Sequence, residues 1–123
     1  MLKVRTYLKE VQGKGIGLFA GEFIPKGVLV SKFEYPDIVI DETKTHGLTK
    51  DFINVYTYEK NGNILLDADN SRFINHSESP NLDYDERMEL YANRDIFEHE
   101  ELTCNYFDIC DWVKRNGLGF ETK

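Results

Sequence analysis

The sequence predicts a mostly β domain made of several small sheets, with one short helix near the carboxyl end. Two observations predict this class. Short strand-like stretches recur along the chain with turn residues roughly every 8 to 12 positions, and only one stretch has helical spacing of its apolar residues. A chain of 123 residues suits one domain, so we expect residues 1–123 to fold as a single unit.

Four strands are expected in the first part of the chain. Polar and apolar residues alternate over 2–12, and a glycine-rich turn at 13–21 leads into a second strand. The β-branched stretch 28–33 and the short run 38–40 predict two more strands. Residues 41–52 are polar and predict at most one helical turn.

A β-hairpin is the clearest feature of the second half. An aromatic and an aliphatic strand within 54–68 flank a turn at 61–63, where the Asn-Gly-Asn run favours a tight reversal. Further strands are expected over 87–93 and 100–107. The stretch 71–81 fits neither a strand nor a helix period, because polar residues follow directly behind an apolar pair.

The expected helix covers residues 108–118. Its apolar residues Ile109, Trp112 and Val113 recur at spacings of three and four, as on one face of a helix. Gly117 suits the carboxyl end of that helix, since glycine readily adopts the left-handed conformation of a C-cap.

Composition and charge exclude several classes of protein. Hydrophobic residues make up 41% of the chain, enough for a globular core, but no apolar run approaches the roughly 20 residues that span a membrane. The charged, alternating start of the chain differs from a secretory signal, so we expect a cytoplasmic or nuclear protein without membrane contact. A formal net charge of −7 repels nucleic-acid phosphate and predicts no direct nucleic-acid binding. The same charge attracts basic partners.

Cysteine usage predicts no metal site. Cys104 and Cys110 are the two cysteines of the chain, and their C-x5-C spacing matches no usual zinc pattern. We expect free, partly buried thiols and no structural disulfide.

The stretch 15–20, GIGLFA, matches the dinucleotide-binding fingerprint G-x-G-x-x-A. That fingerprint needs a helix directly after the glycines, and Gly21, Pro25 and Gly27 break any such helix. A dinucleotide site is therefore rejected. The alternate glycines that begin at Gly13 predict either a backbone that approaches a ligand closely or a tight hairpin turn.

Four stretches together resemble the SET domain of protein lysine methyltransferases. In chain order they are GKGIGLFA (13–20), VYTYEKNGNILLDA (55–68), RFINHSESPN (72–81) and ELTCNY (101–106). The likeness spans residues 3–112 and leaves 113–123 as a short C-terminal segment. It implies a SET-domain fold, in which the central signature meets the C-terminal segment in a knot-like crossing. It also implies methyl transfer from S-adenosylmethionine to a lysine, with an inactive cofactor- or peptide-binding module as the alternative.

The resemblance implies a set of cofactor-binding residues: Lys14, Gly15, Ile16, Gly17, Tyr56, Arg72, Asn75, His76 and Trp112. The first four would hold the methionine end of S-adenosylmethionine through backbone groups, and the Asn-His pair would face it from the middle of the chain. Three of these residues have structural alternatives. Tyr56 can pack in the core, Arg72 can pair with Asp67, and Trp112 can anchor the helix on a sheet.

Tyr106 is the residue that the resemblance marks as catalytic. Its phenol would orient the attacking amine rather than remove a proton, because a tyrosine pKa near 10 makes a poor base. The alternative is a strand aromatic that packs inward. Cys104 and Tyr106 would line the substrate channel, and a small Cys104 side chain would leave room for two or three methyl groups.

The implied partner is a basic protein or peptide segment such as a histone tail, bound as an added strand along a sheet edge. The region 41–52, which helps to build the substrate groove in the family, is very short here. A second subunit would complete a shallow groove, so a homodimer is compatible with the sequence. The family's flanking zinc modules have no counterpart in this sequence, so no metal is expected.

Overall fold

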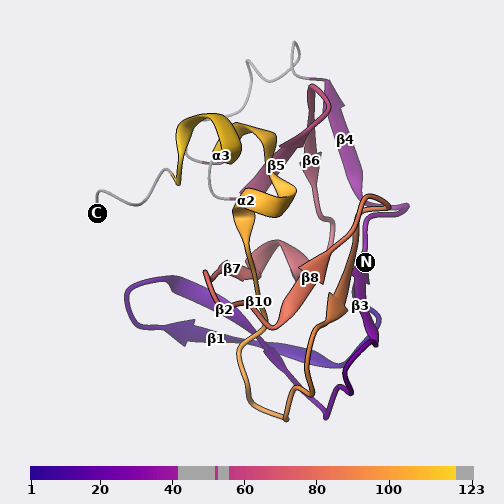
Figure 1. The fold of residues 1–123 in the computed structure, drawn as a ribbon, viewed down its shortest axis with the longest axis vertical. Helices are drawn as coiled ribbons and strands as arrows, with labels where there is room; N and C mark the ends of the chain where they lie inside the picture. Colours follow the sequence, from indigo (N-terminus) through magenta and orange to yellow (C-terminus); the bar gives the residue numbers. More distant parts are fainter. Residues whose placement is uncertain (42–51, 53–55, 119–123) are drawn as a thin grey trace.

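The computed structural model describes residues 1–41, 52 and 56–118. Within that part, the strands form two two-stranded and two three-stranded sheets, followed by short helices (Figure 1). The sheets are small and separate, as the sequence predicts. Most of the polar region 41–52 lies outside the described residues, so its expected helical turn stays a prediction. No helix among the described residues is long and apolar enough to span a membrane.

The glycine-rich segment forms the turn of the first hairpin. Strands β1 (Thr6–Val11) and β2 (Gly15–Ala20) pair antiparallel. Gly13 and Gly15 have φ angles of 82° and 85°, which glycine adopts without the clash of a Cβ atom. The Lys14 amide closes the turn by donating to the Val11 carbonyl at 3.0 Å. The hairpin interpretation of the glycine loop is therefore confirmed.

A second hairpin forms where the sequence predicts it. β5 (Thr57–Lys60) and β6 (Asn63–Leu66) pair antiparallel around a two-residue turn, with Asn61 and Gly62 at φ 52° and 81°. Positive φ at both positions is the geometry that Asn-Gly favours. β4 (Ile38–Asp41) pairs with the other edge of β6.

The third sheet contains a strand that the sequence analysis missed. Its order is β3 (Leu29–Lys32), β9 (Glu89–Ala92) and β8 (Leu82–Tyr84), all antiparallel neighbours. β8 was missed because three residues are too few to display a strand period.

The fourth sheet joins the middle of the chain to its end. β7 (Asn75–His76) and β10 (Thr103–Cys104) pair in parallel, with Asn75 opposite Thr103 and His76 opposite Cys104. A 3₁₀ turn, η2 (Asn70–Phe73), precedes β7. This pairing explains why 71–81 fits no single period: it contains a turn, a two-residue strand and a loop.

Two sequence predictions are wrong in detail near the carboxyl end. The strand expected over 100–107 is shortened to the two residues of β10, because helix α2 (Tyr106–Ile109) begins one residue later, after its cap Asn105. The single expected helix is two helices, since Cys110 is extended at φ −122° and ψ 113° and separates α2 from α3 (Asp111–Asn116). The end of the helix is confirmed: Gly117 has φ 77°, and its amide donates to the Val113 carbonyl at 2.8 Å.

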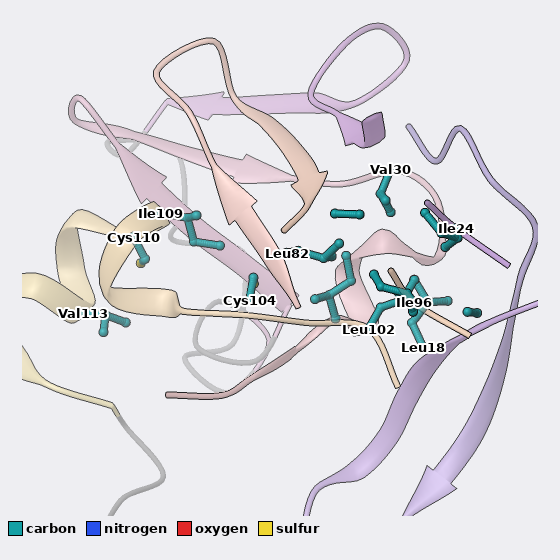
Figure 2. Close-up of a cluster of buried hydrophobic side chains, with 13 residues drawn as sticks. Leu18, Ile24, Val30, Leu82, Ile96, Leu102, Cys104, Ile109, Cys110 and Val113 are labelled. Carbon is teal, nitrogen blue, oxygen red and sulfur yellow. The ribbon is translucent and has the colours of Figure 1, made fainter. Parts of the chain in front are cut away.

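One apolar cluster connects these pieces (Figure 2). Figure 2 shows it running from Leu18, Ile24 and Ile96 past Leu82 and Leu102 to the helix residues Ile109 and Val113. Both cysteines belong to this cluster as free thiols, so they are more deeply buried than expected. The parallel pair of β7 and β10 lies beside this core, since Ile74 and Cys104 belong to the cluster. The core therefore supports the residues of the candidate site.

Candidate functional site

Some of the predicted site residues, among them His76 and Tyr106, converge where β7 meets the start of α2. The Tyr106 backbone amide donates to Nδ1 of His76 at 3.0 Å, and the Tyr106 hydroxyl donates to the Ile74 carbonyl at 2.6 Å. The ring centroids of His76 and Tyr106 lie 5.3 Å apart. Tyr106 therefore faces the 75–76 pair, although about thirty residues separate them in sequence.

Asn105 sets the orientation of Tyr106. The Asn105 side chain accepts from the Phe107 amide at 2.9 Å, the bond that caps the amino end of a helix. Tyr106 is consequently the first residue of α2 and is not part of a strand. The alternative interpretation, a strand aromatic that packs inward, is wrong on secondary structure but right on packing, because Tyr106 lies against the core cluster.

The Tyr106 phenol is held in its protonated form. Burial raises its pKa well above the usual value near 10, and the neighbouring charges of Cys104 and Glu101 act in the same direction. A neutral phenol donates a hydrogen bond and cannot serve as a base near neutral pH. The environment thus fits a residue that orients a reacting group.

His76 connects the glycine turn to α2. Its carbonyl oxygen accepts from the Lys14 ammonium at 3.3 Å, and its ring lies 6.0 Å from the ring of Phe107. Because Nδ1 accepts from the Tyr106 amide, that nitrogen carries no proton. Lys14 and His76, two residues predicted in one cofactor site, are thus in direct contact.

Asn75 ties the glycine strand to the segment before β10. Its side-chain amide donates to the Ile16 carbonyl at 3.2 Å and to Oε2 of Glu101 at 2.8 Å. A Cβ atom on Gly17 would lie 2.7 Å from that same Glu101 oxygen and 3.1 Å from the Asn75 nitrogen. A side chain at 17 would therefore displace the Glu101 carboxylate and the Val11 side chain from their present positions.

Glu101 is a site residue that sequence reasoning missed. It lies within the ELTCNY stretch, but its role depends on a contact with Asn75 that no local pattern reveals. The neighbouring end of the glycine turn is open to solvent. A Cβ atom on Gly15 would meet nothing within 4 Å, and Ile16 is 44% exposed.

Tyr56 and Arg72 lie together at a separate cavity of about 280 Å³, lined also by Phe52, Leu66 and Phe73. The Tyr56 ring meets the Phe73 ring edge-on at 6.0 Å, and the Arg72 guanidinium lies 5.0 Å from the Phe73 ring centre. Tyr56 therefore packs against aromatic rings and also faces a cavity. Phe73 directly precedes Ile74, which accepts the Tyr106 hydroxyl.

The expected pairing of Arg72 with Asp67 is not among the ion pairs of the described residues; Arg72 stacks on Phe73 instead. Burial and the charge of Asp37 raise the pKa of Asp67 to about 6, against a lowering contribution from Ser71. Asp67 is thus a poorly solvated carboxyl, and no arginine among the described residues forms an ion pair with it.

Cys104 and Trp112 lie closer to the core than to an open surface. Cys104 is 2% exposed, and burial raises the pKa of its thiol. Trp112 on α3 is half-buried and packs against the core cluster. This packing supports the anchor interpretation of Trp112, whereas its contact with a cofactor and the channel position of Cys104 stay predictions.

Helix α3 is held against the β5–β6 hairpin by three polar contacts. Arg115 Nη2 lies 2.6 Å from Oε1 of the buried Glu59, and the Asn61 amide donates to Asp111 Oδ2 at 2.9 Å. The Glu59 amide donates to the Cys110 sulfur at 3.4 Å. The hairpin therefore fixes the helix that directly follows α2.

Metal-ligating side chains do not gather at one place in the described part of the chain. It contains no cluster of three or more His, Cys, Asp or Glu side chains with the geometry to hold a metal ion.

A family comparison matches the chain over residues 15–107, to the model of the SET domain. This match begins at Gly15, the first residue of β2, and includes both strands of the β7–β10 pair and the first two residues of α2.

Curated relatives are named as histone-lysine methyltransferases. A putative histone-lysine N-methyltransferase 1 of Plasmodium falciparum is 34% identical over 117 residues, which is 84% of this chain and 2% of the relative. The trr histone-lysine N-methyltransferase of Drosophila melanogaster is 29% identical over 86% of this chain and 5% of its own length. An H3 lysine-4 specific enzyme of Schizosaccharomyces pombe is 31% identical over 74% of this chain and 11% of its own. The chain thus spans a small fraction of these relatives.

Solved structures share the fold. A putative histone methyltransferase of Plasmodium falciparum superposes with a TM-score of 0.65 at 22% identity, covering 90% of this chain and 99% of the other. A structure described as ctPRC2 in an autoinhibited conformation, bound to S-adenosylmethionine, superposes with a TM-score of 0.69 at 28% identity. The superposition covers 94% of this chain and 17% of the ctPRC2 chain.

Proposed function

Since this chain belongs to the SET-domain family, we propose that it transfers a methyl group from S-adenosylmethionine to a lysine of a basic protein segment such as a histone tail. Members of this family that act as methyltransferases use S-adenosylmethionine as the donor. The observation that carries the proposal is the pair of hydrogen bonds that hold Tyr106 against β7 and the residue before it. The Tyr106 amide donates to the His76 ring, and the hydroxyl donates to the Ile74 carbonyl.

The glycine turn offers groups that fit the cofactor. The methionine end of S-adenosylmethionine carries a carboxylate, which suits the exposed Lys14 ammonium beside the His76 carbonyl. The open space at Gly15, where a Cβ atom would meet nothing within 4 Å, allows a ligand to approach the backbone. The partly exposed Ile16 side chain presents apolar surface. These features match the charged methionine end of the cofactor, with an apolar contact beside it.

The chain's own residues have separate roles in the proposed reaction. The bound cofactor supplies an electrophilic methyl group. A lysine amine that has lost its proton forms the new C–N bond, and the electron pair of the broken C–S bond stays on sulfur. Tyr106 orients the amine, since a phenol oxygen whose hydrogen points to the Ile74 carbonyl can accept from an N–H group. Its raised pKa keeps that hydrogen in place.

A basic segment suits the charge of the chain, because a net charge of −7 attracts lysine-rich partners. The cavity beside Tyr56 and Phe73 has aromatic walls that suit the apolar stem of a lysine side chain, while the Arg72 guanidinium already lies over Phe73. We propose that this cavity receives the lysine side chain or residues next to it. With histones as substrates we expect a nuclear protein, and the cytoplasm is the alternative location.

The test compares two tyrosine variants in the presence of labelled S-adenosylmethionine and the four core histones. Tyr106→Phe removes only the hydroxyl, and we expect methyl transfer to fall about a hundredfold, as for a reacting group that loses its positioning contact. Tyr35→Phe is the matched control, because Tyr35 is 94% exposed, and it retains activity. Thermal melting of both variants verifies that they fold.

Two outcomes would contradict the proposal. Cofactor binding by calorimetry without transfer to any histone would favour the inactive binding module. Equal activity of Tyr106→Phe and the unmodified chain would remove Tyr106 from the catalytic role.

A further inference from the structure

Glu101 lies at the junction of three segments that form the candidate cofactor site. Its side chain accepts from Asn75 on β7, and its backbone forms a β-bridge with Phe19 on β2. Its carbonyl accepts from the Asn81 side-chain amide at 2.8 Å. Both the backbone and the carboxylate are thus held in place from different sides.

The carboxylate determines how Asn75 is used. The Asn75 Nδ2 group donates one hydrogen bond to Glu101 and the other to the Ile16 carbonyl. The bond to Glu101 is the shorter of the two, at 2.8 Å against 3.2 Å. The Glu101 bond therefore fixes the rotation of the Asn75 side chain, and this rotation directs the second bond to the glycine turn.

Gly17 supports the same arrangement from the other strand. The Glu101 oxygen occupies the space that a Cβ atom at position 17 would need, at 2.7 Å. Asn75 and the Val11 side chain crowd the same point. The glycine lets β2 approach the Glu101–Asn75 pair closely enough for the Ile16 carbonyl to accept its hydrogen bond.

We propose that Glu101 is a positioning residue of this site: through Asn75 it sets the place of the glycine turn that would bind the methionine end of the cofactor. This inference rests on the proposed function for its effect on methyl transfer. Its structural part, the tie from Glu101 through Asn75 to Ile16, concerns the chain alone and can be measured without any cofactor.

Two substitutions separate the hydrogen bond from the charge. Glu101→Gln keeps an acceptor oxygen for Asn75 but removes the negative charge, whereas Glu101→Ala removes both. If positioning is the role, Glu101→Gln retains most cofactor affinity and Glu101→Ala binds S-adenosylmethionine about tenfold more weakly, as expected for one lost hydrogen bond. Glu98→Gln is the matched control, since Glu98 lies in the same segment with a 58% exposed side chain.

The experiment combines three measurements on the full chain. Calorimetry gives the dissociation constant of S-adenosylmethionine, and kinetics with core histones give KM for the cofactor and kcat separately. Amide hydrogen exchange by NMR follows residues 15–17 in the free protein. We expect Glu101→Ala to raise the cofactor KM about tenfold with kcat changed less than threefold, in line with loss of binding alone. We also expect it to speed exchange in the turn, while Glu98→Gln changes neither.

The outcomes decide the two proposals separately. Unchanged exchange at residues 15–17 in Glu101→Ala would overturn the positioning role, whatever the activity. Equal loss of affinity in Glu101→Gln and Glu101→Ala would also overturn it, because the charge would then be the active feature. Faster exchange in Glu101→Ala would support the structural tie even if the unmodified chain neither bound S-adenosylmethionine nor methylated histones. The latter result would refute the proposed function alone.

Discussion

Removal of the Arg115 side chain tests how firmly the hairpin holds the C-terminal helices. The Glu59 side chain is 7% exposed and the Arg115 side chain 57% exposed, with 2.6 Å between the paired atoms. An exposed ion pair contributes about 0–1 kcal/mol, whereas loss of one partner of a buried pair costs about 3–5 kcal/mol. Because only the carboxylate is buried, we expect Arg115→Leu to lower the free energy of unfolding by about 1–2 kcal/mol.

Urea denaturation followed by circular dichroism measures this loss. The matched control is Lys114→Leu on the same helix, whose 3.9 Å contact with Asp111 joins partly exposed groups and should change stability by less than about 0.5 kcal/mol. A double-mutant cycle with Glu59→Gln isolates the pair. If the effects of Arg115→Leu and Glu59→Gln simply add, the two side chains are not coupled and the reasoning is wrong.

Two further predictions follow from buried groups. The pKa of Asp67 is raised to about 6, so its contribution to stability is complete below about pH 4 and declines as the pH rises through 6. The Asp67→Asn variant lacks this titration. Relative to the unmodified chain, its free energy of unfolding should therefore rise by up to about 3 kcal/mol between pH 4 and 8. A difference in urea unfolding energy that stays constant over this range would contradict the assigned pKa. Cys104→Tyr should reduce the number of methyl groups added per lysine, read by mass spectrometry of the histone product. An unchanged product distribution would exclude Cys104 from the channel.

Local turn chemistry made part of the fold predictable. Asn61-Gly62 and the glycines around Lys14 adopt positive φ where few other residues can, so both hairpins could be located from the sequence. The end of α3 at Gly117 was predictable for the same reason. These features depend on neighbouring residues and need no information from the rest of the chain.

The contacts between distant segments could not be derived from periodicity. The pairing of Asn75 with Thr103 and the tie from Asn75 to Glu101 join segments that no sequence pattern relates. Only the likeness to a family placed Asn75, His76 and Tyr106 in one site. The start of α2 had a readable signal, since Asn105 is a favourable helix cap, but the apparent strand through 100–107 concealed it.

Two-residue strands cannot align themselves, and β7 and β10 are both that short. Their register is set by what surrounds them: the Ser77 amide bonded to the Cys104 carbonyl, and Asn81 holding the backbone on both sides of Leu102. A substitution in this neighbourhood, remote from any reacting atom, would slide one short strand past the other. Such a variant would keep every chemical group that methyl transfer requires and still present them out of alignment.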